Sequence, residues 1–456
     1  MEAQEGGILI ISGIGGDTRR YRCLHLQEQL ALRGYASTLR EPHDPRLPDD
    51  VLHHEMVILH RVPLTPMIDL VIALAHSQGK AVIFETDDLI FEPTLQAQIG
   101  YLDALPPEEA RRFREALEGQ QQSFRRSDAV LTATAFLAEE AQKRGKRAYV
   151  HRNVPSREMF RIAAEAREQR ESHAPAVVLG YFSGTASHDR DFQSIVPALV
   201  WAMERYPNLW LHIGGYLEPD ERFHPFQQRI RRVHFVPWQE LPHFIAQVDI
   251  NLVPLEMDNP FCQAKSEIKF LEAALVEVPT IATPIRAYRH AIRQGENGLL
   301  AGTEAEWREA LQRLIEDEGA RRRMGEAALR TVYAHYLPEQ RAEALEALLP
   351  KLRAAAPPPQ PPGQAAESLL AATARYAAQM ETRDAVQRQQ LAALRQTLRS
   401  YEKHLFYAEQ QIRQLEAHIQ AIMQGRVMRL MTQMHRWRQA LFHRQPGDDS
   451  SGGQSL

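Results

Sequence analysis

Short apolar segments alternate with amphipathic helical segments through most of this chain, and this alternation limits the folds that it can adopt. In the first half, strands are predicted at 8–12, 56–60, 81–85 and 129–132. Helical patterns separate them, at 66–78, 108–126 and 135–144. Buried apolar strands that alternate with helices predict a parallel sheet with helices on both of its faces.

The alternation restarts after a polar stretch at 163–173, which we expect to connect two domains. Further strands are predicted at 177–182, 209–213, 233–236, 249–253 and 279–283, with helices that include 192–205 and 266–276. We therefore expect an α/β protein with two Rossmann-like domains, 7–165 and 174–335, that face a cleft. Ligands of such sheets bind beyond the carboxyl ends of the strands.

The C-terminal part of the chain changes character. We expect a return helix at 336–353, a proline-rich linker at 354–367 and a coiled coil at 368–424, because consecutive prolines cannot continue a helix. Five unbroken heptads support the coiled coil. Their a positions are Leu391, Leu398, Leu405, Ile412 and Ile419, and their d positions are Leu394, Tyr401, Ala408, Leu415 and Ile422. The simplest partner for this stripe is another copy, so a homo-oligomer is predicted.

A different helix is expected at 425–444. It combines apolar residues such as Met431 and Trp437 with five arginines and no acidic residue: Arg426, Arg429, Arg436, Arg438 and Arg444. Such a helix can lie on an anionic membrane surface, and it can equally dock within the oligomer. The tail at 445–456 is rich in Gly, Ser and Asp and is expected to be disordered.

Composition excludes several classes of protein. A net charge of −4 gives no bulk attraction for nucleic acid. The only two cysteines, Cys23 and Cys262, cannot form a disulfide framework or a four-cysteine zinc site. The sequence shows neither a signal peptide nor a run of about 18 apolar residues. We expect a cytoplasmic protein with at most a peripheral contact at the inner face of the membrane.

The segment 265–272 combines charges with a predicted helix start. Ser266 is expected to cap a helix whose free amides favour an anion, and Lys265 adds a full positive charge beside it. Lys269 and Glu272 are three residues apart and so share a face of that helix. This arrangement suits a diphosphate next to a carboxylate that accepts hydrogen bonds from a ribose diol. The alternative is an ordinary Lys–Glu pair on a solvated helix.

Several motifs in both domains occur in the order found in one enzyme family. They are Tyr21-Arg22, 85–91 with its Asp-Asp-Leu-Ile-Phe run, 180–185, 265–272, 279–283, 295–300 and Trp307. On these residues the chain, over about 7–350, resembles the retaining GT-B glycosyltransferases of family 4, also called glycosyl transferases group 1.

The resemblance implies a metal-independent hexosyltransferase without a cofactor, which moves a sugar with retention from a nucleotide-diphosphate donor to a glycan, lipid-linked or other acceptor. Glu272 would match the second glutamate of the family's E-x7-E motif and bind the donor ribose. The first glutamate is absent, because Ala264 stands at its position. Lys265 and Lys269 would then compensate the diphosphate charge, which stabilises the leaving group.

Two further sets of residues are candidates for the cleft. On the donor side, Arg190 is expected to clamp a phosphate, and Gly184, Thr185 and His188 belong to the same loop. The candidates for the acceptor side are Gly15, Gly16, Arg22, His60, Asp87 and Asp88. Arg190 could instead form a surface ion pair, and His60 could be an ordinary buried histidine. Asp87 and Asp88 could hold Mg²⁺, but no third ligand follows from the sequence, so no metal site is predicted.

Two other functions share this architecture. A nucleotide-sugar 2-epimerase would need acid and base groups around the sugar, and the sequence shows no clear set. A non-enzymatic scaffold could bind a sugar nucleotide or glycan while the coiled coil recruits partners, and Ala264 keeps this alternative open.

Overall fold

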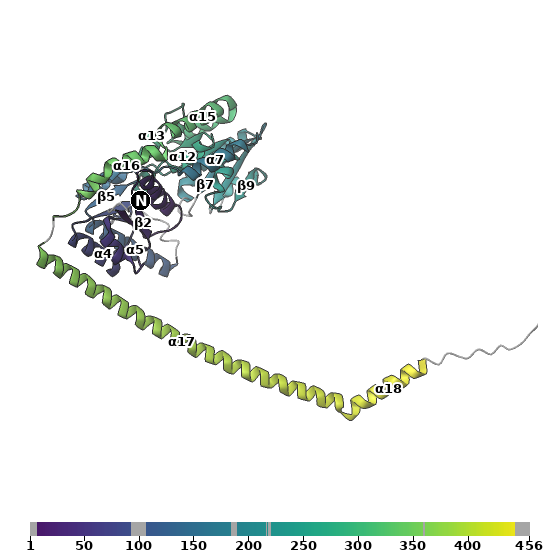
Figure 1. Ribbon diagram of the computed structural model, residues 1–456. Helices are drawn as coiled ribbons and strands as arrows, with labels where there is room; N and C mark the ends of the chain where they lie inside the picture. Colours follow the sequence, from purple (N-terminus) through teal and green to yellow (C-terminus); the bar gives the residue numbers. More distant parts are fainter. Residues whose placement is uncertain are drawn as a thin grey trace, which may run out of the picture. The chain divides into compact units, whose positions relative to one another are not determined.

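The computed structural model describes residues 7–92, 106–183, 189–215, 217, 220–358 and 361–442. The chain divides into two compact units, Met1–Tyr376 and Ala377–Leu456. The first unit contains two parallel α/β sheets with helices packed on them (Figure 1).

The first sheet has six parallel strands in the order β2-β1-β3-β4-β5-β6. These strands are β1 (Gly7–Ser12), β2 (Ser37–Arg40), β3 (His54–His60), β4 (Ala81–Thr86), β5 (Ala129–Thr132) and β6 (Arg147–Val150). Its helical segments are α1 (Gly16–Arg19), the π-helical turn η1 (Arg20–Leu24), α2 (His25–Leu32), α3 (Leu47–His53), α4 (Pro66–Ser77), α5 (Pro107–Arg126) and α6 (Ala135–Lys143). The central strands β1, β3 and β4 are buried on both faces, which explains their continuous apolar sequences.

The second sheet also has six parallel strands, in the order β12-β11-β10-β7-β8-β9. They are β7 (Val177–Ser183), β8 (Leu209–Gly215), β9 (Ile230–Val233), β10 (Ile250–Val253), β11 (Thr280–Ala282) and β12 (Leu299–Leu300). The helical segments here are α8 (Asp189–Gln193), α9 (Val196–Arg205), the 3-10 helix η5 (Glu221–Arg229), α10 (Leu241–Ala246), α11 (Pro260–Gln263), α12 (Ile268–Leu275), α13 (Arg286–Ala291), α14 (Glu304–Glu316) and α15 (Glu318–His335). Two Rossmann-like domains are thus confirmed.

Two helices carry the chain between the domains. Helix α7 (Arg157–Glu168) packs against α10 and α12 of the second domain, with Met159 and Ala163 in its core. The polar stretch at 163–173, which was expected to connect the domains, is helical over its first six residues, where polar side chains lie on the outer face of α7 and small apolar ones are buried. Helix α16 (Pro338–Arg353) returns to the first domain, where it packs on α2 and buries Leu345 and Leu349.

The predicted strands differ from the observed ones mainly at the sheet edges. The strand expected at 233–236 is wrong, since β9 ends at Val233 and the next residues leave the sheet. Strands β2 and β6 were not predicted, because each has four residues and none of their side chains is fully buried. Short, partly exposed strands carry little of the apolar signal by which strands are recognised.

The C-terminal segment is helical, but its long helix begins at Pro362, inside the expected linker at 354–367, because proline is tolerated in the first turn of a helix. Helix α17 (Pro362–Gln424) has 63 residues, and α18 (Arg426–Phe442) follows it. At the start of α17, Ala372 packs on Leu70 and Ala73 of α4, and Arg375 forms a hydrogen bond of 2.9 Å with Asp69. None of the helices in the described part of the chain is both long and apolar enough to cross a membrane.

Candidate functional site

A cavity of about 220 Å³ lies between the two Rossmann-like domains. Residues that follow the carboxyl ends of strands β1, β4, β7, β8 and β9 line it together with α12. The first domain contributes Asp17, Thr18, Tyr21 and Asp87. The second domain contributes Phe182, Ser183, Gly214, Gly215, 233–236, Trp238, Leu241, Phe244, Ile245, Asn251, Ile268, Lys269 and Glu272. This is the edge of the sheets at which α/β proteins bind ligands.

Helix α12 brings Lys269 and Glu272 to the cavity. It begins at Ile268, with Glu267 as its N-cap and no side-chain capping bond, so the predicted serine cap at Ser266 is wrong. The Ser266 hydroxyl instead accepts a hydrogen bond of 2.9 Å from the Asn153 amide. Glu267 is buried and binds Arg152 at 3.2 Å and the Tyr336 hydroxyl at 3.0 Å, so this carboxylate holds the start of α12 against neighbouring segments.

The electrostatic environment of Lys269 is unusual. Burial lowers the pKa of Lys269 to about 8, and the carboxylates of Asp191 and Glu272 oppose that shift. The ammonium lies 5.2 Å from the centre of the Tyr181 ring. A cation that is partly removed from water in this way binds an anion more strongly than a solvated lysine does.

Glu272 is connected to the first domain. The Tyr21 hydroxyl donates a hydrogen bond of 2.8 Å to Glu272 Oε1. Burial raises the pKa of Glu272, although Arg20 and that hydrogen bond favour the ionised form. A carboxylate with one oxygen held by tyrosine keeps its second oxygen for a ligand hydroxyl.

Lys265 lies beside the cavity rather than in its lining. Its ammonium is 2.7 Å from Asp88 of the first domain and 3.9 Å from the centre of the Phe261 ring. Arg61 also binds Asp88, at 3.1 Å, and it binds the neighbouring Asp87 at 3.3 Å. The structure thus joins two residues that the sequence assigned to opposite sides of the cleft.

Ala264, the position at which the resemblance would place the first glutamate, is fully buried at the domain interface. It belongs to a hydrophobic cluster with Leu89 and Phe91 of the first domain. Its carbonyl accepts a hydrogen bond of 3.3 Å from the Thr134 hydroxyl. A glutamate side chain at this position would need this packing to change.

Sequence reasoning missed Arg20 and Trp238. Arg20 is buried, and its guanidinium lies 4.4 Å from the Tyr21 ring and 4.7 Å from the Trp238 ring, so it is placed over aromatic residues of both domains. Asp17 binds it at 3.0 Å. Arg20 and Tyr21 belong to the π-helical turn η1, and such turns are frequent at functional sites. The signal was present only in the adjacent Arg-Tyr-Arg sequence.

Glycines shape two edges of the site. At the end of β8, Gly215 has φ +97°, and a Cβ there would lie 1.8 Å from the Ser183 carbonyl oxygen, so no other residue fits. In the first domain, a Cβ on Gly13 would lie 2.4 Å from the Arg61 carbonyl oxygen. Gly15 and Gly16 are exposed at the start of α1, Gly15 as its N-cap and Gly16 as its first residue, and both lie outside the lining of the cavity.

The structure contradicts the placement of Arg22 and His60 in the cleft. Arg22 is buried, and its Nε donates a hydrogen bond of 2.6 Å to Glu85 while Nη1 donates to the His151 carbonyl and to Asn153. His60 is also fully buried, and it bonds the Ser12 hydroxyl at 2.9 Å. Burial holds the pKa of His60 well below its usual value and raises the pKa of Glu85 to about 7. His60 is in the interior because it ends a central strand that neighbouring segments cover, and Arg22 is held there by its bonds to Glu85, His151 and Asn153.

The donor-side loop is only partly described. Gly184, Thr185 and His188 lie outside the described residues. Arg190 is exposed on α8 and is not part of the cavity lining.

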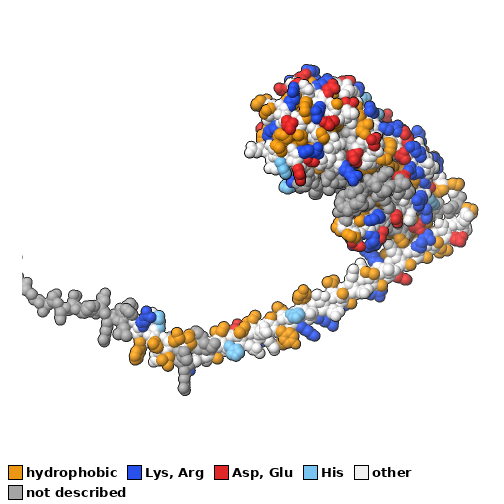
Figure 2. All heavy atoms as spheres, turned by 180° about the vertical axis from the view of Figure 1, so that it is seen from behind, with side chains coloured by type: hydrophobic (Ala, Val, Ile, Leu, Met, Phe, Trp, Pro, Cys, Tyr) orange, Lys and Arg blue, Asp and Glu red, His pale blue; other side chains and the backbone are white. Residues whose placement is uncertain are grey.

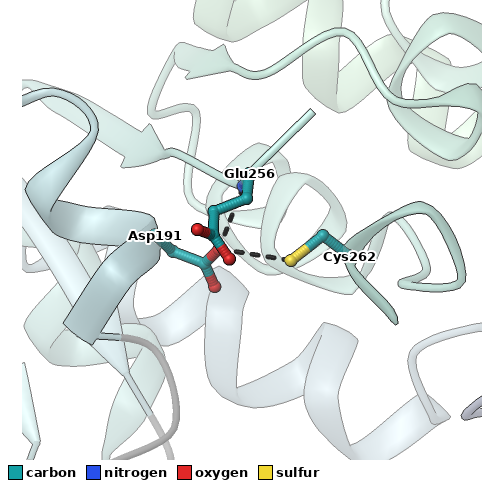
Figure 3. A group of neighbouring side chains, drawn as sticks. All are labelled: Asp191, Glu256 and Cys262. Atoms are coloured by element: carbon teal, nitrogen blue, oxygen red, sulfur yellow. Dashed lines mark hydrogen bonds between the residues drawn. The ribbon is translucent and has the colours of Figure 1, made fainter. Parts of the chain in front are cut away.

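Asp191, Glu256 and Cys262 are grouped within 4.8 Å of one another, close enough to raise the question of a metal site (Figure 3). Asp191 Oδ1 accepts hydrogen bonds from the Glu256 backbone amide at 3.0 Å and from the Cys262 thiol at 3.3 Å. Burial and the Asp191 charge raise the pKa of the Cys262 thiol, which favours the protonated form that donates to Asp191. The hydrogen bonds fix the segment before α11 instead.

The fold and this cavity define the GT-B class, in which two Rossmann-like domains enclose a ligand site. Residues 195–347, less than half of the chain, match the family described as "Glycosyl transferase-like". None of the curated proteins compared with the chain matches it in sequence.

Solved structures share the fold at low sequence identity. HepE from Anabaena, in complex with UDP and glucose, is 14% identical, with a TM-score of 0.52 over 76% of this chain and 99% of that chain. Sucrose-phosphate synthase from Thermosynechococcus elongatus is 17% identical, with a TM-score of 0.52 over 77% of this chain and 100% of that one. WaaG, a glycosyltransferase involved in lipopolysaccharide biosynthesis, is 13% identical, with a TM-score of 0.50 over 74% and 99%.

Proposed function

We propose that this protein is a glycosyltransferase that takes its sugar from a nucleotide-diphosphate donor bound between the two domains. The observation that carries the proposal is the position of Lys269 and Glu272 on one face of α12, in an interdomain cavity at the carboxyl ends of both sheets. The match of 195–347 to glycosyl transferase-like sequences and the resemblance of the fold to HepE with bound UDP and glucose support it.

In this proposal the donor meets three kinds of group. Lys269 is the cation nearest the diphosphate, where it stabilises the charge that develops on the leaving group. Glu272 accepts hydrogen bonds from the ribose diol through the oxygen that Tyr21 leaves available. The apolar walls, which include Phe235, Trp238 and Phe244, suit the flat faces of a base or sugar ring.

Finer features of the reaction are also proposals. Retention, a hexosyl donor and independence of metal ions follow from the resemblance to family 4 in the segment 265–272. Lys265, Ser266 and Arg190, with the loop of Gly184, Thr185 and His188, remain candidates for donor contacts outside the observed lining. Asp87 lines the cavity from the first domain and is therefore the acceptor-side candidate that we favour, with Asp88 next to it.

The test is a donor panel on the full-length protein. UDP-glucose and other nucleotide sugars are titrated by calorimetry, and release of nucleoside diphosphate is then followed with glycan and lipid-linked acceptors. We expect one donor to bind and its nucleoside diphosphate to be released when an acceptor is present. Conversion of the sugar without that release would indicate an epimerase, and no binding to any donor would contradict the proposal.

A non-enzymatic binding scaffold is the second candidate, because Ala264 is packed into the domain interface where the motif has a glutamate. The scaffold predicts donor binding with no turnover for every acceptor. The exchange Ala264→Glu does not separate the two candidates, since it disturbs the packing. Turnover by the unaltered protein does.

We also propose that α18 contacts an anionic membrane surface, which would place the enzyme near a lipid-linked acceptor. Leu430, Met431, Met434 and Trp437 are exposed on this helix, and Arg429, Arg436 and Arg438 are exposed beside them. A basic amphipathic helix of this kind binds anionic lipid. Sedimentation with phosphatidylglycerol vesicles is expected, and equal sedimentation with neutral phosphatidylcholine vesicles would contradict the electrostatic part.

A further inference from the structure

The apolar stripe on α17 has no partner among the described residues of the second compact unit. All of its described side chains at the a and d positions from Leu391 to Ile419 are on an exposed helix, and its large apolar residues are 49–69% exposed. Hydrophobic side chains recur along this helix in the space-filling view (Figure 2). A stripe of this length is costly to leave in water, so it needs a covering helix.

The heptad spacing selects the shape of that covering helix. Residues at a and d recur every 3.5 positions on average, which is the pattern for which two or more helices supercoil with their seams in contact. A second copy of the same helix has the same spacing and length, and it matches the stripe along its whole extent.

Charges beside the stripe distinguish the two directions in which copies can pair. The e positions are Arg395, Glu402, Glu409 and Glu416. The g positions are Gln390, Thr397, His404, Gln411 and His418, with no acidic residue. In coiled coils the e and g side chains flank the seam and set the orientation of the helices.

Parallel copies give every glutamate a compatible neighbour. In that arrangement each g residue meets the e residue five positions later on the other copy. Glu409 then faces His404, Glu402 faces Thr397, and Glu416 faces Gln411. All three of these neighbours can donate a hydrogen bond to a carboxylate.

Antiparallel copies bring like charges together. When the whole stripe overlaps, a layers meet d layers, and e residues meet e residues. Glu402 of each copy then faces Glu409 of the other, while Arg395 faces Glu416. Two of the four e–e contacts are thus carboxylate against carboxylate, which is unfavourable, whereas the parallel arrangement has no contact between like charges.

We infer that α17 assembles with further copies of this chain into a parallel, in-register coiled coil through residues 391–422. In this arrangement the C-terminal ends of all copies of α17 lie together, so their α18 helices are all at the same end of the coiled coil. Several α18 helices at one end would each contact the membrane weakly, and together they would bind it multivalently. This inference is independent of the proposed reaction, because it concerns only the second compact unit.

Disulfide trapping in the full-length protein tests the inference. The native Cys23 and Cys262 are buried, so the parent protein serves as the background. Three variants are needed: Leu394→Cys at a d position, Ile419→Cys at an a position, and Gln396→Cys at an outward f position. Disulfides require Cα atoms within about 7 Å, so only residues that meet at the seam are trapped.

We expect Leu394→Cys alone to form a disulfide-linked dimer under mild oxidation, and the same for Ile419→Cys. The parent and Gln396→Cys should stay unlinked. If the chains are antiparallel, Leu394→Cys alone fails to link, and only its mixture with Ile419→Cys links. That result would overturn the inference, as would a monomeric mass for the parent by light scattering.

Discussion

At the scale of single residues, Glu272 is the best test of the cavity, because it can be changed without losing its contact with the first domain. In Glu272→Gln, the amide oxygen can still accept the hydrogen bond from Tyr21, but the negative charge is removed. Hydrogen bonds to a charged group contribute about 1.5–3 kcal/mol, so we expect donor affinity to fall about 10- to 100-fold.

Titration calorimetry with UDP-glucose, or with whichever donor the panel identifies, measures this change. Glu296→Gln is the matched control, since Glu296 pairs with Arg293 on the surface and lies outside the cavity lining. Equal affinity in Glu272→Gln and the parent would remove Glu272 from the donor site.

Lys269 predicts a pH dependence of donor binding. Burial lowers its pKa to about 8, so the folded protein loses this cation above that pH while a solvated lysine would keep it to about pH 10.5. Donor affinity should therefore be constant below about pH 8 and fall by about tenfold per pH unit above it.

The comparison variant is Lys269→Arg, because a guanidinium remains charged throughout this range. Its affinity profile should be flat between pH 7 and 9.5 in the same calorimetric titration. A decrease of the same size in both proteins would assign the titration to another group.

The sequence predicted some of these site residues and not others, for a physical reason. Lys269 and Glu272 follow from helical spacing, which is local. Arg22 was placed in the cleft by the family resemblance and His60 because it closes a predicted strand, yet Glu85 and Ser12 hold them in the interior. Whether a residue is covered depends on packing between segments that are distant in the sequence, and a local sequence pattern does not contain that information.

At the scale of helices and strands, the central elements were predictable because they bury continuous apolar runs. Strand β5 was predicted with its observed ends, and β1, β3 and β4 within two residues. The strand predicted at 233–236 lies after most of the observed β9, because the segment 233–236 is largely apolar for a different reason: it lines the interdomain cavity. An apolar segment that faces a ligand site has the same composition as a strand.

Two neighbouring residues of α17 can show whether the copies assemble through the heptad seam or through exposed apolar surface in general. Leu405 stands at an a position and Phe406 next to it at a b position, and their side chains are 64% and 58% exposed. Because only Leu405 would enter the seam, Leu405→Asp should dissociate the assembly into monomers, whereas Phe406→Asp should leave it intact.

Light scattering on the two full-length variants at one concentration measures this difference. Loss of assembly in both variants would mean that exposed apolar surface in general, rather than the heptad seam, joins the copies.

At the scale of the first compact unit, the two domains are tied together by polar contacts of very different exposure. Lys265 and Asp88, whose side chains are only 23% and 14% exposed, pair at 2.7 Å, and the bond of Tyr21 with Glu272 lies at the cavity. The pair of Arg286 and Glu139 also joins the domains, but about half of each side chain is in solvent. Helix α16 adds an apolar connection through Leu345 and Leu349.

These two ion pairs predict different losses of stability. In Asp88→Asn, Lys265 and Arg61 both lose a carboxylate partner in a partly buried setting, and we expect the free energy of unfolding to fall by about 1.5–3 kcal/mol. In Glu139→Gln, an exposed pair is broken, and the change should stay within about 1 kcal/mol, because solvent and salt screen such pairs. Both are measured by urea denaturation of the full-length protein. If Asp88→Asn cost no more than Glu139→Gln, the contact between Lys265 and Asp88 would not hold the domains together. Lys265 would then be as free as Lys269 to meet a donor.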